Sequence, residues 1–100
     1  MHVIAKKALE DFWKIHPTAK ASLEVWYKVV SRSRFANFSE VREAFRSADY
    51  TAPYTIFDIG GNTFRLIAVI HYNRQKVYIR QLFTHPEYDR WCRQKRSKGT

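Results

Sequence analysis

Apolar residues recur at helical spacing along the first third of the chain. Between positions 5 and 15 they stand three and four residues apart, which predicts an amphipathic helix. The helix is expected to stop at His16, because the proline that follows disfavours helical geometry in the residue before it. The spacing returns over positions 18–33, with Thr18 as the expected N-cap of a second helix. Residues 1–4 are β-prone, so the pattern predicts a short strand followed by two antiparallel helices.

The second half of the chain has the composition of strands. Positions 35–53 are irregular, with one short helix expected from position 39 to 45 or 46 and a loop after it. Three later segments are rich in β-branched and aromatic residues, which favour strands: positions 54–59, 63–72 and 77–83. Their order and short connections predict an antiparallel meander.

Turn and cap residues separate these segments. The Gly-Gly-Asn sequence at positions 60–62 is typical of a tight hairpin, because glycine accepts positive φ. Thr84 is the expected N-cap of a short last helix, with Pro86 in its first turn and Glu87 three residues after the cap. Positions 93–100 are expected to be a basic, frayed tail.

These elements predict an α+β fold in one domain. A chain of 100 residues is long enough for one hydrophobic core, and 45% of its residues are hydrophobic. The expected order is a short N-terminal strand, two antiparallel helices, a three-stranded antiparallel meander and a short C-terminal helix. Helices gathered on one face of such a sheet form two layers, and the first strand is expected to join the sheet beside a meander strand.

Alternation along the strands suggests a site on the face away from the helices. On the middle strand, Arg65 and His71 lie opposite an all-apolar set. If Arg80 on the next strand shares their face, two guanidiniums stand on adjacent strands and an anion between them would offset their repulsion. Arginine suits phosphate because its planar fork donates two hydrogen bonds at once. The alternative is two exposed arginines paired with Asp58 or Glu87.

The last helix offers groups for proton transfer. His85 and Tyr88 are three residues apart and share a helix face. Histidine suits general acid–base work near neutral pH, and tyrosine can donate a proton or stack on a base. Asp89 could orient His85 or favour the helix N-terminus. The simpler alternative is a histidine at the helix start beside a half-buried tyrosine.

The charge narrows the choice of partners. The formal net charge is +9, with +3 in residues 1–50 and +6 in residues 51–100. Such a field attracts nucleic acid first, then an anionic membrane or an acidic protein. The single cysteine, Cys92, excludes an internal disulfide and a cysteine-based zinc site, and the histidines have no metal-ligand spacing. The longest uncharged apolar run, residues 66–70, is too short to span a bilayer, so a cytoplasmic protein without cofactors is expected.

Four short motifs occur in order: the turn at 60–62, an Arg-Leu-Ile strand at 65–67, a Tyr-Ile-Arg strand at 78–80 and a Thr-His-Pro-Glu-Tyr-Asp segment at 84–89. Together with the opening strand and helix, this set resembles the HigB toxins, a branch of the RelE-like mRNA interferases of bacterial toxin–antitoxin systems. The sequence departs from the family pattern at Asp58 and Phe64, where Asn and often Tyr are expected, so no role can rest on a tyrosine hydroxyl at position 64.

The resemblance implies a metal-independent endoribonuclease that cuts mRNA, commonly on the translating ribosome. It also implies a HigA-like antitoxin with a helix-turn-helix domain, which alone would bring the toxin to operator DNA. The residues implied to be catalytic are Arg65, Arg80, His85 and Tyr88. Those expected to bind RNA are Asn62, His71, Thr84, Arg90, Arg93, Lys95 and Arg96.

Two other functions fit the same charge. One is a basic RNA- or ribosome-binding module without turnover, which would not need Arg65, Arg80 and His85 in one cleft. The other is a structural partner of an acidic protein, for which the basic surface is only an interface.

Overall fold

The protein has an α+β fold, as predicted, but the expectation that its helices gather on one face of the sheet is wrong, because the last helix lies on the face opposite the first two helices. The computed structural model describes the backbone of residues 1–98 and the side chains of residues 1–94. The elements, in order, are β1 (His2–Ile4), α1 (Lys7–Ile15), the 3₁₀ turn η1 (Pro17–Ala19), α2 (Lys20–Arg32), α3 (Phe38–Ala44), β2 (Asp49–Thr51), β3 (Tyr54–Ile59), β4 (Phe64–His71), β5 (Lys76–Thr84) and α4 (His85–Lys98).

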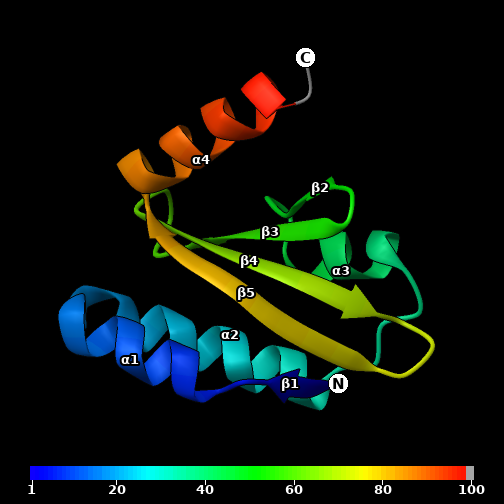
Figure 1. Ribbon diagram of the computed structural model, residues 1–100. Coiled ribbons are helices and arrows are strands. Elements are labelled where there is room, and N and C mark those ends of the chain that lie inside the picture. Colours follow the sequence, from blue (N-terminus) through cyan, green and yellow to red (C-terminus); the bar gives the residue numbers. More distant parts are fainter. Residues whose placement is uncertain (99–100) are drawn as a thin grey trace.

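The strands form one sheet in the order β1-β5-β4-β3-β2. The first strand runs parallel to β5, and the other pairs are antiparallel. Figure 1 shows α1 and α2 on one side of this sheet, while α4 rises from the end of β5 on the other side. We call the side away from α1 and α2 the open face.

The core lies between the sheet and the first two helices. Leu23 and Trp26 of α2 are fully buried, and the Trp26 ring meets Phe57 of β3 edge-on at 5.4 Å. The predicted all-apolar face of β4 is confirmed, because Leu66 and Ala68 are fully buried in the same cluster. Burial of these side chains is the main stabilising term for a sheet packed on helices, so it fixes which side of β4 remains open.

A bulge in β5 breaks the predicted alternation. Ile67 of β4 pairs with Gln81 and Ala68 pairs with Ile79, so Arg80 between them has no partner. The extra residue shifts the pleat, and Ile79 below it and Leu82 above it both pack against the core. The assumption of strict alternation was therefore wrong.

Several predicted boundaries are corrected. The stop at His16 is confirmed, but Thr18 does not cap α2, because it lies inside η1. Strand β2 falls where a loop was expected. All three of its residues are exposed, so the strand has no buried face whose apolar pattern would have predicted it. The last helix continues to Lys98 instead of ending before position 93, and positions 99–100 of the expected tail lie outside the described residues.

None of the helices described here combines the length and the apolar character that crossing a lipid bilayer requires.

Candidate active site

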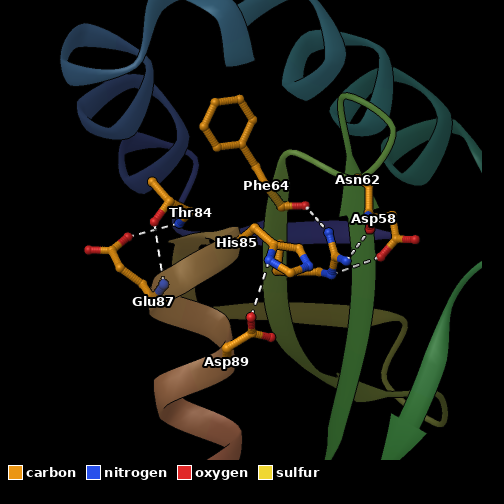
Figure 2. Close-up of polar contacts among 8 residues, drawn as sticks. Asp58, Asn62, Phe64, Thr84, His85, Glu87 and Asp89 are labelled. Carbon is orange, nitrogen blue, oxygen red and sulfur yellow. Dashed lines mark hydrogen bonds and ion pairs between the residues drawn. The ribbon is translucent and has the colours of Figure 1, made fainter.

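A nearly buried arginine forms the centre of the site. Arg65 on β4 is only 7% exposed, and its Nε lies 3.1 Å from Oδ1 of Asp58, directly opposite on β3. Its two terminal nitrogens donate hydrogen bonds to the carbonyl of Phe64, at 3.0 Å, and to Oδ1 of Asn62. Figure 2 shows these contacts converging on the guanidinium. Arg65 is thus paired with Asp58, as the alternative interpretation supposed, but it is held inside the fold and not on an exposed surface.

The turn between β3 and β4 places Asn62 for this contact. Gly60 and Gly61 adopt φ of 63° and 67°, the left-handed region that glycine enters without steric cost. The chain reverses within four residues, and the Asn62 amide returns toward the start of β4. The glycines therefore act through geometry, since two side chains at these positions would strain the turn that positions Asn62.

Tyr88 of α4 covers the guanidinium from the other side. The Cζ atom of Arg65 lies 5.3 Å from the centre of the Tyr88 ring, a cation–π distance. The same ring lies 6.1 Å from Trp91 in a stacked arrangement. Burial of the phenol raises the pKa of Tyr88 to about 12, with a contribution from Cys92 in the same direction. At neutral pH this hydroxyl can donate a proton but cannot accept one.

We expect the phenol of Tyr88 to remain protonated until about pH 12. A folded-state pKa raised above the ordinary value of 10 stabilises the fold fully below pH 10, and this stabilisation is lost as pH rises toward 12. Alkaline titration followed by tyrosinate absorbance should therefore lose one late-ionising group in Tyr88→Phe. Loss of a group that ionises at the ordinary pKa would contradict the assignment, and Tyr50→Phe, an exposed tyrosine, is the matched control.

A capping box starts α4 and fixes the position of His85. The Thr84 N–H donates to Oε1 of Glu87 at 2.8 Å, and the Glu87 N–H donates to the Thr84 hydroxyl at 3.4 Å, as predicted. The His85 N–H donates to the Thr63 carbonyl at 3.1 Å, which ties the helix start to the β3–β4 turn. His85 therefore lies at the same end of the sheet as Arg65.

The His85 side chain is partly exposed and has a carboxylate beside it. Its Nδ1 lies 3.3 Å from Oδ2 of Asp89, one turn later, and the side chain is 42% exposed (Figure 2). In the tautomer that carries its hydrogen on Nδ1, the imidazole donates a hydrogen bond to this carboxylate. The lone pair is then on Nε2, which faces away from Asp89 and is available as a base.

Replacing Thr84 by alanine should cost about 1 kcal/mol of folding free energy, because the first turn of α4 loses a hydroxyl acceptor. The hydrogen bond that the Thr84 N–H donates to the Glu87 carboxylate also lowers the pKa of that carboxyl below its ordinary value of 4.5. A lowered folded-state pKa stabilises the fold above pH 4.5, and this stabilisation is lost as pH falls through the lowered value. Unfolding of Thr84→Ala and of the wild type at pH 7 and at pH 3 measures both effects; a Thr84→Ser control should lose little. An equal cost for alanine and serine would contradict the cap assignment.

A cavity of about 360 Å³ opens beside Tyr88, under α4. Its walls include Tyr54 and Ile56 of β3 and Trp91 of α4, with the β2–β3 turn closing one side. The Trp91 ring meets Tyr54 at 5.4 Å and Phe83 at 5.9 Å. Aromatic walls next to an arginine suit a planar nucleobase whose phosphate reaches the guanidinium.

The other predicted site residues lie elsewhere. Phe83, not Arg80, stands opposite Arg65, so the structure does not form the predicted pair of guanidiniums. Arg80 lies at the bulge, where it lines a shallow hollow with Asp11 and Phe12 of α1. The reason is the extra residue in β5, which the period-two pattern does not reveal.

The predicted RNA-binding residues are spread over a larger surface. Arg90 and Arg93 are exposed on α4, and the side chains of Lys95 and Arg96 lie outside the described residues. His71 is exposed at the far end of β4. The aromatic residues Tyr54 and Phe83 were not predicted as part of the site; Phe83 was missed because the bulge moves it to the open face. Among residues 1–98, no three His, Cys, Asp or Glu side chains come together as metal ligands.

The sequence of this chain is similar to a known protein family and to named proteins. The family model described as HigB toxin, the RelE-like toxic component of a toxin–antitoxin system, matches residues 19–91. The chain belongs to the HigB toxin family. That match contains the buried arginine, the turn and the first half of α4.

Named relatives in the HigB family align along almost the whole chain. The "mRNA interferase toxin HigB" of Escherichia coli (strain K12) is 33% identical over 102 residues, which cover 99% of this chain and 98% of the relative. The "mRNA interferase HigB" of Escherichia coli O6:H1 is 30% identical over 96 residues, 93% of each chain. The resemblance predicted from four short motifs is therefore confirmed over the full fold.

Proposed function

We propose that this HigB-family toxin cleaves mRNA in the cleft between α4 and the open face of the sheet. The observation that carries the proposal is the Arg65 guanidinium, which is held by Asp58 and lies against Tyr88. A fixed cation in a desolvated cleft is what a transition state with growing negative charge requires. A solvated surface arginine would have to be ordered at the moment of reaction.

The reaction that fits these groups is attack of the RNA 2′-hydroxyl on its own phosphate. The oxygen–phosphorus bond to the 2′-oxygen forms and the bond to the 5′-oxygen of the next nucleotide breaks. The products are a 2′,3′-cyclic phosphate and a 5′-hydroxyl. Arg65 stabilises the charge on the non-bridging oxygens, and no metal takes part.

The proton donor and acceptor follow from the geometry of α4. His85 is assigned as the base that accepts the 2′-hydroxyl proton, because Asp89 beside Nδ1 leaves Nε2 for this task. Tyr88 is assigned as the acid that protonates the 5′-oxygen, because its raised pKa keeps the hydroxyl protonated. Arg80, which lies at the bulge beside α1, is assigned to RNA outside the reacting phosphate.

Membership of a toxin–antitoxin family implies an antitoxin partner. We assign this role to a HigA-like protein with a helix-turn-helix domain, through which alone the toxin would reach operator DNA. The net charge of +9 suits mRNA bound to ribosomal RNA in the cytoplasm, and Asn62, Thr84, Arg90 and Arg93 would contact that RNA at the mouth of the cleft.

The test is growth of a bacterial culture on induced expression of the chain, with primer extension on a reporter mRNA in the same cells. Arg65→Ala/His85→Ala is compared with Lys28→Ala/Arg32→Ala, which changes two exposed residues of α2 on the other side of the sheet. Arrest with discrete cuts is expected from the wild type and the α2 variant, and neither from the cleft variant. Arrest by all three without cuts would instead favour the non-catalytic RNA- or ribosome-binding module.

A further inference from the structure

The open face carries a second group of basic side chains, remote from Arg65. Lys76 pairs with His71 on β4 and with His2 on β1, so these three residues cross three neighbouring strands. The next residues on two of these strands, Val3 and Val77, are buried in the core, so the three side chains share the open face. His2 and His71 are exposed and Lys76 is partly exposed. We call these three residues the far row.

An aromatic ring stands next to the far row. Tyr78 lies opposite Val69, and its ring meets His71 edge-on at 5.1 Å. The turn that follows β4 adds the exposed Arg74 and is held by Gln75, whose Nε2 donates to the carbonyls of Phe35 and Tyr72 at 2.7 Å each. The basic and aromatic groups therefore stand on an ordered part of the sheet.

We propose that the far row is a second RNA phosphate site, with Tyr78 as the surface on which a neighbouring base stacks. Lys76 brings a positive charge, and His2 and His71, on the two adjacent strands about 5 Å to either side, bring ring nitrogens, so one bound phosphate can contact all three side chains. No residue of β4 or β5 is acidic, so the open face along these strands presents no carboxylate of their own to compete for the site.

The proposal rests on the proposed function for the identity of the RNA as substrate. His71 is six residues from Arg65 along β4, which is about 20 Å and within reach of a short single-stranded segment. An acidic protein would also be attracted by Lys76 and Arg74, but a stacking ring beside basic side chains is typical of single-stranded nucleic acid sites. The open face then holds RNA at two points, the cleft and the far row.

The test is binding of a single-stranded oligonucleotide with 2′-O-methyl groups, which cannot be cleaved by 2′-hydroxyl attack. Affinity is measured by fluorescence anisotropy at several salt concentrations. Lys76→Gln/His71→Gln should bind at least about tenfold more weakly at low salt, and the slope of log affinity against log salt should fall by about 0.7 for each phosphate that the variant no longer neutralises. The matched control, Lys28→Gln on α2, should change affinity less than about twofold.

Stacking has its own pair of variants. Tyr78→Ala should weaken binding at least about fivefold without changing the salt slope, while Tyr78→Phe should keep the affinity. The proposal would be overturned if Lys76→Gln/His71→Gln bound the oligonucleotide as tightly as Lys28→Gln does. It would also be overturned if the double variant bound RNA normally but bound an acidic antitoxin more weakly. A dinucleotide is too short to reach the far row, so its cleavage tests the cleft alone. Normal cleavage of the dinucleotide by Arg65→Ala would contradict the proposed function, while the far row would still be tested by the binding measurements.

Discussion

Replacing Arg65 by alanine should lower the single-turnover rate of mRNA cleavage by at least about 100-fold, the usual loss when a preorganised charge donor is removed from a reaction centre. The expectation follows from how the side chain is held. Asp58, Asn62 and the Phe64 carbonyl fix three sides of the guanidinium, so the side chain is already ordered in the absence of RNA. The rate is measured with excess toxin on a defined RNA, with folding checked by circular dichroism.

Arg65→Lys separates charge from geometry. Lysine keeps the positive charge but has one nitrogen in place of the three that contact Asp58, Asn62 and the Phe64 carbonyl, so most of the loss should remain. Arg32→Lys on α2 is the control and should leave the rate unchanged. A loss below tenfold for Arg65→Ala, which corresponds to about 1.4 kcal/mol, would remove Arg65 from the catalytic assignment.

Replacing Trp26 by alanine should cost about 3–5 kcal/mol of folding free energy. Trp26 is 1% exposed and packs edge-on against Phe57, so its removal leaves a cavity that the sheet cannot close. For a chain of this size the melting temperature should fall by more than about 12 °C, measured by thermal unfolding.

The informative control is Trp26→Phe. Within the described residues the Trp26 Nε1 is buried without a hydrogen-bond partner, so phenylalanine removes no hydrogen bond. We expect a loss of about 1–2 kcal/mol, from volume alone. Equal losses for alanine and phenylalanine would show that packing against Phe57 is not what holds α2 on the sheet.

The predictions that succeeded depended on strong local signals. The proline after His16 stops α1, the two glycines turn β3 into β4, and the Thr84–Glu87 capping box starts α4. Each of these residue types has a narrow conformational preference that acts over a few neighbours. The apolar face of β4 was also predicted correctly, because a strand that packs on helices carries apolar residues at every second position.

The failures required information from other parts of the chain. The β5 bulge leaves Arg80 without a partner on β4 and places Phe83 opposite Arg65, and nothing within the β5 sequence marks it. The all-exposed β2 carries no burial pattern, since it is defined only by its pairing with β3. The depth of Arg65 was likewise not predictable, because Tyr88 of α4 covers it from outside the sheet. Motif order pointed to candidate site residues, but only tertiary packing decides which of them meet.

The pairing of β1 with β5 has a consequence for biosynthesis. Strand β1 is synthesised more than 70 residues before Lys76 and its neighbours, so it has no edge to join until they have been made. Such long-range closure is late and slow, because a large loop of chain must be ordered first. The segment that completes the sheet leads directly into α4, which brings His85 and Tyr88 to the cleft. The nascent chain therefore lacks the proposed catalytic groups of α4 until the whole of the sheet has been synthesised.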